Sequence, residues 1–299
     1  MSDASADARP IALATARAAR DLDEDLAPLA AALQGQGAAA EIVVWDDPDI
    51  DWARFRLVVL RSTWDYSLRL GDFLAWLDRT ARLTRVVNPP SVVRWNLDKH
   101  YLGELRRTGA AIVPTTFVEP GEDAARSIAQ FLREETAADV VIKPVVGSGS
   151  RDAQRHARGA VAAMTAHIGR LLAEQRSVLL QPYLDRVDEQ GETALVYYNG
   201  EFSHAFRKGP LLQRGSGASE ALFAQEEITP RTAAADELAL GARVLGVLPF
   251  APLAYARIDL IRGKDGAPCV LELELAEPSM YFSCGAGSAE RFATLLNRL

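Results

Sequence analysis

The sequence has few cysteines, no signal-peptide pattern and no long apolar run. Cys269 and Cys284 are the only cysteines among 299 residues, which excludes a disulfide framework and favours a reducing compartment. The first ten residues, MSDASADARP, contain acids and no apolar core, so we expect a frayed tail rather than a signal peptide. No apolar stretch approaches the length of a membrane span. We therefore expect a cytoplasmic protein with no membrane partner.

Four common binding signatures are also missing. The net charge is -7 at pH 7 and no basic stripe stands out, which argues against a nucleic-acid partner. None of the four histidines has the spacing of a zinc site, so we interpret His204 as a packed or surface histidine. No G-x-G-x-x-G is present, and no lysine follows the glycines of residues 147–150 (GSGS). The dinucleotide fingerprint and the P-loop are thereby excluded.

The first 90 residues alternate between predicted strands and helices. Apolar residues make up 48% of the chain and charged ones 24%, as in a soluble globular protein long enough for two domains. We predict strands at residues 11–15, 41–45 and 56–61, and helices at residues 21–33 and 72–83. This alternation indicates a parallel sheet with helices on its faces. Asn88-Pro89-Pro90 is the predicted domain boundary because prolines interrupt both strands and helices.

Polar residues follow two of these strands. Ligands bind outside the carboxyl ends of parallel strands, and Thr15 and residues 61–66 (RSTWDY) fall at such ends. Hydroxyls, an acid and an aromatic ring follow a buried strand there, which favours a substrate loop. The alternative is an ordinary loop in which Trp64 packs on the core.

The remaining chain mixes helices with hairpins. We predict helices at 96–108, 123–135, 161–175, 231–245 and 288–299, and strands at 110–118, from 139 and at 177–184. Asn96 would cap its helix and place Lys99 in the first turn, where a lysine is unfavourable for the helix dipole. Residues 193–208 form a second hairpin around Asn199-Gly200. The Gly/Ser-rich residues 209–219 are a candidate lid.

A strand that carries a lysine leads directly into a glycine-rich loop. Residues 139–152 read DVVIKPVVGSGSRD, with Lys143 near the end of the strand. Backbone amides of such a loop and an ammonium group can together bind phosphates. A plain flexible turn is the alternative, since Gly-Ser-Gly serves both purposes.

The stretch from Tyr255 to Pro278 gathers charge on one face of a hairpin. Asp265-Gly266 is a typical two-residue turn, and it would place Asp259 opposite Glu272 and Arg257 opposite Glu274. Side chains alternate along strands, so these four residues share a face. One arginine cannot neutralise three acids, whereas Mg²⁺ prefers hard oxygen ligands of this kind. A solvated, amphipathic hairpin is the alternative.

Taken in order, these features resemble ATP-grasp ligases of the glutathione-synthetase and D-alanine-ligase type. The resemblance rests on two lysines, the glycine loop, the Gln-Pro-Tyr-Leu segment at 181–184 and the final D…E-x-E set, and it covers nearly the whole chain. It implies an α/β class with α+β lobes. An N-terminal Rossmann-like domain (residues 1–87) would precede an ATP-grasp domain (88–299) with a lid subdomain at about 110–180. ATP and Mg²⁺ are the implied cofactors.

The resemblance also implies roles for single residues. Glu192 stands where an acid holds the ribose, and the segment at 181–184 where the backbone reads adenine. The implied cofactor-binding residues are Lys99, Lys143, Gly147, Ser148, Gly149, Ser150, Gln181, Pro182, Tyr183, Leu184 and Glu192; the metal ligands are Asp259, Glu272 and Glu274; the catalytic residues are Arg257, Arg207 and Lys143.

Two positions depart from the family pattern. Glu274 replaces the asparagine that is frequent at the last metal position, and Ala194 replaces a cation that glutathione synthetases tend to carry. Within the family, the chain most resembles the cyclo-ligases that close O-ureido-D-serine to D-cycloserine, judged from its length and from RSTWDY and NPPSVVRWNLDK.

The implied reaction activates a carboxylate as an acyl phosphate, which a nitrogen then attacks. We expect a small amino-acid-like substrate, with Asp65 beside its ammonium, in a site formed by Thr15, Ser62, Thr63, Asp65 and Ser279. An intermolecular carboxylate–amine ligase is the first alternative, and a non-catalytic nucleotide-binding protein is the second. The resemblance leaves a homodimer open.

Overall fold

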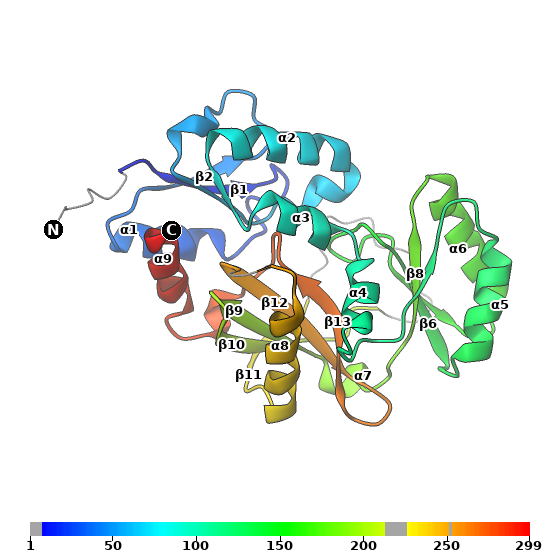
Figure 1. The fold of residues 1–299 in the computed structure, drawn as a ribbon. Helices are drawn as coiled ribbons and strands as arrows, with labels where there is room; N and C mark the ends of the chain where they lie inside the picture. Colours follow the sequence, from blue (N-terminus) through cyan, green and yellow to red (C-terminus); the bar gives the residue numbers. More distant parts are fainter. Residues whose placement is uncertain (1–7, 213–225, 251–252) are drawn as a thin grey trace.

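Three β-sheets lie side by side in the molecule (Figure 1). The computed structural model describes residues 8–212, 226–250 and 253–299. The strand orders are β2-β1-β3-β4 in the first sheet, β11-β10-β9-β12-β13 in the central sheet and β5-β8-β6-β7 in the third sheet. Most of the candidate lid at 209–219 lies outside the described residues. Among the described helices, none is both long and apolar enough to cross a membrane.

The first sheet is parallel, as the strand–helix alternation predicts. Its strands are β1 (Ile11–Thr15), β2 (Ala40–Val44), β3 (Leu57–Leu60) and β4 (Arg85–Val87). β1 and β3 are fully buried because helices cover both faces. The amphipathic helix α2 (Leu70–Leu83) covers one face through Phe73, Trp76 and Leu77. On the other face lie α1 (Leu26–Gly35) and the C-terminal helix α9 (Ser288–Arg298).

The first and central sheets share one hydrophobic core. Phe292 and Leu296 of α9 pack in the same cluster as Ile11 of β1 and Tyr255 of the central sheet. Burial of this continuous apolar surface holds the two sheets together. The C-terminal helix α9 therefore packs against the N-terminal sheet as well as against the central sheet.

Two buried polar side chains fasten this junction. Asp25 accepts hydrogen bonds from the backbone N–H groups of Met280, Tyr281 and Phe282 at 2.6, 3.0 and 2.9 Å. Asn88, at the predicted boundary, donates to backbone carbonyls of β12 and of the segment after β13. Buried polar groups persist where they are paired in this way.

The central sheet is antiparallel and has one apolar and one charged face. Its strands are β9 (Glu192–Tyr198), β10 (Glu201–Lys208), β11 (Ile228–Arg231), β12 (Tyr255–Arg262) and β13 (Pro268–Glu274). Ile258, Leu273 and Leu275 pack against α4 (Tyr101–Arg107) and α8 (Ala235–Val247). Alternation along the strands sends the charged side chains to the opposite face.

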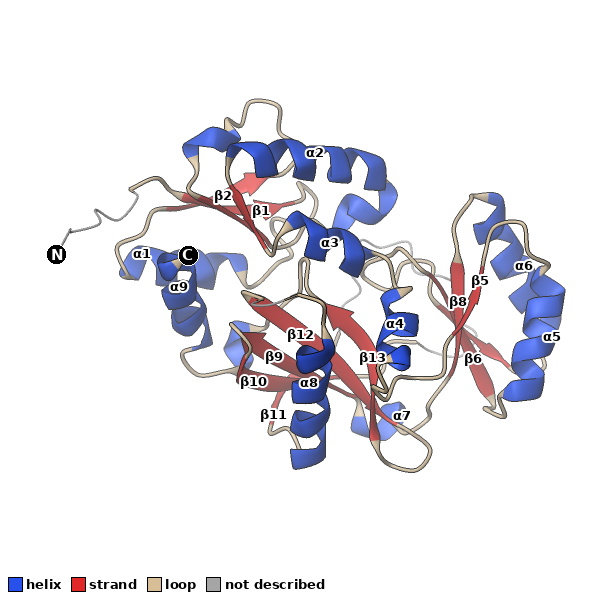
Figure 2. Ribbon diagram, in the orientation of Figure 1, coloured by secondary structure: helices blue, strands red, loops and turns tan. Residues whose placement is uncertain are grey.

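The third sheet has a hydrophobic core of its own. It consists of β5 (Thr116–Val118), β6 (Asp139–Pro144), β7 (Gln154–Ala157) and β8 (Val178–Pro182). The helices α5 (Ala124–Glu134) and α6 (Val161–Ala173) lie together on its outer face (Figure 2). Val140 and Ile142 point into this core, whereas Val141 and Lys143 line a cavity on the other side. The predicted domain and lid bounds remain predictions.

The second hairpin has the predicted two-residue turn. Asn199 and Gly200 both have positive φ, at 50° and 81°, as a hairpin turn of this length requires. Ser203 then forms a bulge, so that pairing changes from Phe202–Tyr197 to His204–Val196. The bulge reverses which face the following residues of β10 present.

The acidic hairpin reaches the predicted pairing by a different route. The predicted two-residue turn at Asp265-Gly266 is wrong, because the connection spans residues 263–267 and is closed by the hydrogen bond from Gly263 N–H to Ala267 O at 2.8 Å. A bulge next to Asp259 compensates for the longer turn. The predicted pairs 257–274 and 259–272 are therefore present. Leu271 lies at this bulge and lines the cavity.

The helix predicted at 96–108 is wrong. Two helices, α3 (Pro90–Leu97) and α4, replace it, and Lys99 stands in the break between them. Pro90 begins α3, because proline suits the first turn of a helix. Asn96 is no cap: its amide binds the backbone of β13 through Leu273 O at 2.7 Å. The strand predicted at 110–118 is reduced to β5, and β7, β11 and α7 (Val187–Gln190) were not predicted.

Candidate active site

A cavity of about 200 Å³ lies where the three sheets meet. Every residue predicted to bind nucleotide lines it, from Lys99 to Glu192. Arg257, Glu272, Glu274 and Ser279 also line it. Residues that are far apart in the sequence are thus brought together around one cavity.

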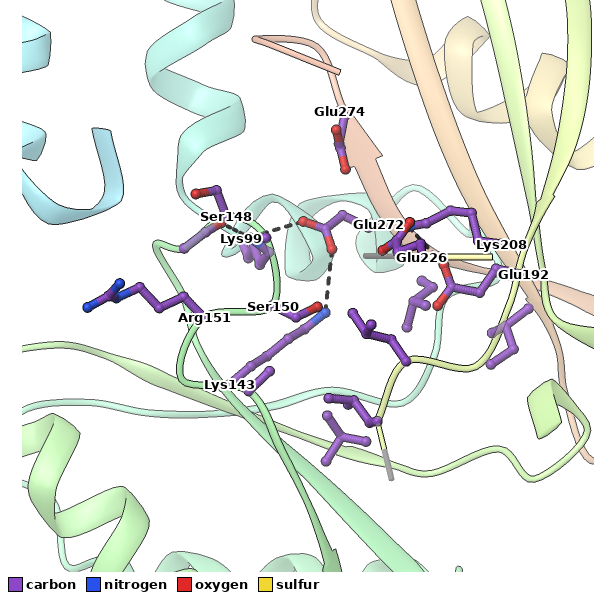
Figure 3. Close-up of a pocket in the computed structure, with 18 of the residues that line it drawn as sticks. Lys99, Lys143, Ser148, Ser150, Arg151, Glu192, Lys208, Glu226, Glu272 and Glu274 are labelled. Atoms are coloured by element: carbon purple, nitrogen blue, oxygen red, sulfur yellow. Dashed lines mark hydrogen bonds and ion pairs between the residues drawn. The ribbon is translucent and has the colours of Figure 1, made fainter. Parts of the chain in front are cut away.

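Glu272 lies between the two predicted phosphate-binding lysines (Figure 3). Lys99 Nζ is 3.0 Å from Glu272 Oε1, and Lys143 Nζ is 3.6 Å from Glu272 Oε2. Burial alone would raise the pKa of Glu272, but Lys99 and Lys143 outweigh it and lower the pKa to about 2. Burial also lowers the pKa of Lys143, against the opposing charge of Glu272. The lysines are therefore held at the cavity by one shared carboxylate.

The glycine loop is docked onto the segment that follows β3. Trp64–Leu68 is a 3-10 helix, and Tyr66 donates from its hydroxyl to Gly147 O at 3.2 Å. Ser148 Oγ donates to Trp64 O at 2.6 Å. Lys99 Nζ donates to the same Gly147 carbonyl at 2.9 Å. The loop is consequently fixed from both the first sheet and the α3–α4 break.

The predicted adenine segment forms the end of β8 and the residues after it. Gln181 donates to Thr115 Oγ1 at 2.9 Å, and Tyr183 N–H donates to Asp139 O at 2.9 Å. Arg155 lies over the Tyr183 ring at 3.5 Å, a favourable cation–π distance. These contacts give the segment a defined backbone course along one wall of the cavity.

Lys208, and not Arg207, presents its charge to the cavity. Lys208 Nζ lies 3.0 Å from Asp259 Oδ2 and 3.2 Å from Glu192 Oε2. Arg207, predicted to reach phosphate, does not line the cavity; its Nε donates to Gln190 O at 3.2 Å. Neighbouring residues of a strand point to opposite faces, and the bulge in β10 decides which of the two faces the site.

A glycine permits the close approach of α7 to β10. Gly191 has φ of +67°, and a Cβ there would lie 2.4 Å from Lys208 O. A side chain is excluded by both the conformation and the space. Gly191 thus allows Glu192 and Lys208 to begin and end the two paired strands beside each other.

Arg257 binds three other residues on the charged face of the central sheet. Its guanidinium donates to Asp259 Oδ1 at 2.8 Å, to Glu274, and to Ser279 O at 2.8 Å. Burial raises the pKa of Glu274 to about 8, against the lowering charge of Arg257 and with the charges of Asp259 and Glu272 adding to the rise. One arginine does not neutralise the crowded carboxylates, as the sequence suggests.

The predicted substrate residues of the first sheet lie outside the cavity. Thr15 and Ser62 bind each other, with 2.7 Å between their hydroxyl oxygens, and Thr63 is fully buried. Asp65 accepts from Trp45 Nε1 at 2.8 Å and pairs with Arg69. These hydroxyls and this carboxylate pack within the domain.

Three polar residues of the cavity are examples of neighbours that the sequence did not predict. Tyr66 follows Asp65 and points to the glycine loop, Lys208 follows Arg207, and Glu277 comes three residues after the D…E-x-E set. The two bulges and the 3-10 helix change which side chains face the cavity, so that these residues face it and some of the predicted ones do not. An acid placed just before Pro278, beyond the predicted metal ligands, is the one signal that the sequence offered for Glu277.

The residues present fit a magnesium ion held by two carboxylates. No group of three His, Cys, Asp or Glu side chains in the described ranges converges on a common metal position. Glu272 and Glu274 line the cavity, whereas Asp259 does not and is bound by Arg257 and Lys208. Mg²⁺ is commonly held by one or two carboxylates together with phosphate and water oxygens. Asp259 would join them only by exchanging Lys208 for the ion.

Comparisons with known proteins identify relatives of this chain. Residues 11–88 match the family model of the N-terminal domain of D-cycloserine synthetase DcsG. The chain is 40% identical over 294 residues to the cycloserine biosynthesis protein DcsG of Streptomyces lavendulae, which covers 96% of this chain and 97% of that protein. The crystal structure of D-cycloserine synthetase DcsG matches with a TM-score of 0.90 and 39% identity, covering 96% of this chain and 98% of that chain.

A more distant structure shows the fold that these proteins share. The ATP-grasp ligase PsnB, complexed with its minimal precursor, is 17% identical with a TM-score of 0.64, covering 98% of this chain and 100% of that chain. The predicted ATP-grasp fold and the predicted ligase activity are confirmed. The chain belongs to the DcsG family of ATP-grasp ligases.

Proposed function

We propose that this enzyme uses ATP to close O-ureido-D-serine to D-cycloserine. The observation that carries the proposal is 40% identity to DcsG of Streptomyces lavendulae over 96% of the chain. The charged cavity at the meeting point of the three sheets supports it, because it gathers phosphate-binding and carboxylate groups in one place. Membership of a ligase family sets aside the alternative of a non-catalytic nucleotide-binding protein.

ATP would enter between the third and central sheets. Its phosphates would take Lys99 and Lys143 away from Glu272, since phosphate oxygens carry more negative charge than one carboxylate. The backbone amides of residues 147–150 would cover the phosphates. Residues 181–184 would contact adenine, and Glu192 the ribose.

Movement of the two lysines from Glu272 to the phosphates would also free a metal ligand. Once the lysines turn to phosphate, Glu272 is free to act with Glu274 as a metal ligand. A bound Mg²⁺ would supply charge neutralisation on the phosphates. Arg257 and Lys208 would remain as fixed cations beside the transferred phosphoryl group, where preorganised charge lowers the barrier most.

The chemistry requires one activated carboxylate and one nitrogen. The substrate carboxylate attacks the terminal phosphorus of ATP, which gives an acyl phosphate and ADP. The nitrogen of the O–N bond then attacks the carboxyl carbon, and the bond from that carbon to the phosphate oxygen breaks. Loss of the carbamoyl group, by water, as carbon dioxide and ammonia completes the balance. Because both groups belong to one molecule, closure gains proximity without a second substrate site.

The intermolecular ligase is distinguished by a single assay. Wild-type enzyme with O-ureido-D-serine, ATP and Mg²⁺ should release ADP and phosphate without any added amine, and mass spectrometry should detect cycloserine. ADP release that depends on a second amino compound, with a product mass equal to two substrates less water, would assign the intermolecular reaction instead.

We also propose a cytoplasmic location for the enzyme. Cys269 and Cys284 are both free thiols, as a reducing compartment favours. A homodimer is part of the same proposal, and light scattering at several protein concentrations tests it.

A further inference from the structure

Among the described residues, five acidic side chains line the cavity, and one of them has no charged partner. The four with a lysine or arginine partner are Glu192, Glu226, Glu272 and Glu274. Within the described part of the chain, the carboxylate of Glu277 makes no hydrogen bond or ion pair with another residue. An unpaired carboxylate in a protein interior is costly unless a ligand supplies the missing charge.

The carboxylate of Glu277 is buried and faces the cavity. Glu277 is 9% exposed, and its carboxyl experiences the charges of Lys99, Glu272 and Arg257, all of which line the same cavity. Burial raises the pKa of Glu277 to about 7, against the lowering charge of Lys99. Burial raises the pKa of Tyr66, which also lines the cavity, and the charge of Glu277 adds to the rise. The group therefore lies where the first and central sheets meet the cavity.

The role predicted for Asp65 is unfilled. Asp65 is engaged by Arg69 and Trp45 outside the cavity, so it cannot meet a substrate ammonium there. Glu277 is an acid of the right charge inside the cavity. The aromatic rings of Trp64 and Tyr66 line the cavity as well, and aromatic faces add to the binding of a cation.

The geometry points to Glu277 as the residue that binds the ammonium group of an amino-acid substrate. The inference rests on the proposed function for its substrate class, because O-ureido-D-serine carries a free amino group next to its carboxylate. A substrate without that amine leaves Glu277 buried and unpaired. A site built for a charged hydrogen bond rejects such an analogue strongly, by about tenfold to a hundredfold for a single bond.

Binding, rather than turnover, gives the sharpest test. O-ureido-D-serine, D-serine and D-alanine are each compared with the compound that lacks the amine, by calorimetry on the full-length protein with Mg²⁺ and a non-hydrolysable ATP analogue. We expect the wild type to bind at least one amino compound about ten to a hundred times more tightly than the matched compound that lacks the amine. Glu277→Gln should reduce that ratio to near one and leave nucleotide affinity unchanged.

Matched variants separate a contact from a structural effect. Glu201→Gln removes an exposed acid at the far end of β10 and should keep the wild-type ratio. Glu277→Asp keeps the charge on a shorter chain and should keep part of the preference for the amine. If E277Q does not bind nucleotide, E277D provides the test instead. A preference of E277D for the amine that equals that of the wild type would then overturn the inference.

Two further outcomes overturn it: E277Q retaining the preference for the amine, or a wild type that shows none with any pair. The proposed function is judged separately. If the wild type prefers the amine but releases no ADP from O-ureido-D-serine, the cyclo-ligase proposal fails and the assignment of Glu277 stands.

Discussion

The ammonium of Lys208 in β10 lies 3.0 Å from Oδ2 of Asp259 in β12, across the intervening strand β9 of the central sheet. Asp259 is 1% exposed, so this contact neutralises a carboxylate that water cannot reach. Burial lowers the pKa of Lys208, but Asp259 and Glu192 outweigh it and hold the pKa well above its ordinary value. These two carboxylates therefore hold the lysine in its charged form.

Replacing Lys208 should be far more damaging than replacing its neighbour. Lys208→Ala leaves Asp259 and Glu192 short of a cation, and we expect a loss of roughly 1–3 kcal/mol in the free energy of unfolding together with weaker nucleotide binding. Arg207→Ala, on the opposite face, should change nucleotide affinity less. Urea unfolding and nucleotide titration of both variants measure this difference. Equal losses of nucleotide affinity in the two variants would show that Arg207 contributes to the site as much as Lys208 does.

Glu272→Gln should abolish ATP turnover. The change removes the carboxylate shared by Lys99 and Lys143 and one of the two proposed metal ligands, while the backbone pairing of β13 is untouched. We expect kcat to fall by at least about a hundredfold, as for loss of one preorganised electrostatic group. Steady-state rates over a Mg²⁺ titration check this, with Glu201→Gln as the control. Wild-type rates in E272Q would refute the metal assignment.

Nucleotide binding should stabilise the fold by mass action. ATP with Mg²⁺ at a hundredfold excess over Kd should add about 2.7 kcal/mol, which is measurable as a rise in melting temperature. Lys143→Ala should reduce the shift, whereas Lys264→Ala, an exposed lysine near the tip of the acidic hairpin, should not. A wild type that shows no shift with any nucleotide would contradict the proposed ATP site.

Two histidines should give opposite pH dependences of stability. Burial, with the charges of His156 and Arg170 adding to it, lowers the pKa of His167 to about 4 from 6.5. The unfolded chain then binds more protons between these values, so stability should fall as pH drops from 6.5 to about 4. His167→Gln should flatten that loss in urea unfolding at a series of pH values. A parallel pH curve in the variant would show that His167 has no such role.

His100 serves as the contrasting case. Burial opposes its protonation, but the hydrogen bond to Glu119 and the charge of Asp98 prevail and raise its pKa above 6.5. The contribution of His100 to the free energy of unfolding is complete below pH 6.5. It should disappear as the pH rises through the higher pKa that His100 has in the folded protein. His100→Gln should therefore lose stability at low pH and approach the wild type at high pH.

The sequence was sufficient for the residue types of the site but not for every neighbour. A regular hairpin closed by Asn199-Gly200 would pair Arg207 with Glu192. The bulge at Ser203 pairs Lys208 with Glu192 instead. In the acidic hairpin, a longer turn and a bulge cancel, so the predicted pairs are correct although the predicted turn is wrong. Bulges depend on local backbone geometry, which the order of apolar and polar residues does not encode.

The same limit applies to the segment after β3. Polar residues identified it as part of the site, but the 3-10 helix turns Trp64 and Tyr66 to the cavity and leaves Asp65 with Arg69. The strand–helix alternation, by contrast, is a long periodic signal, and the parallel first sheet follows it.

The shared core of the first and central sheets decides which part of the enzyme can swing. Separating those sheets would expose the residues around Phe292 and Tyr255 and break the three backbone contacts of Asp25. The third sheet keeps a complete core against α5 and α6 and loses little apolar burial if it pivots. We therefore expect the mouth of the site to open by a hinge motion of the third sheet, which must break the contacts of the glycine loop with Trp64, Tyr66 and Lys99.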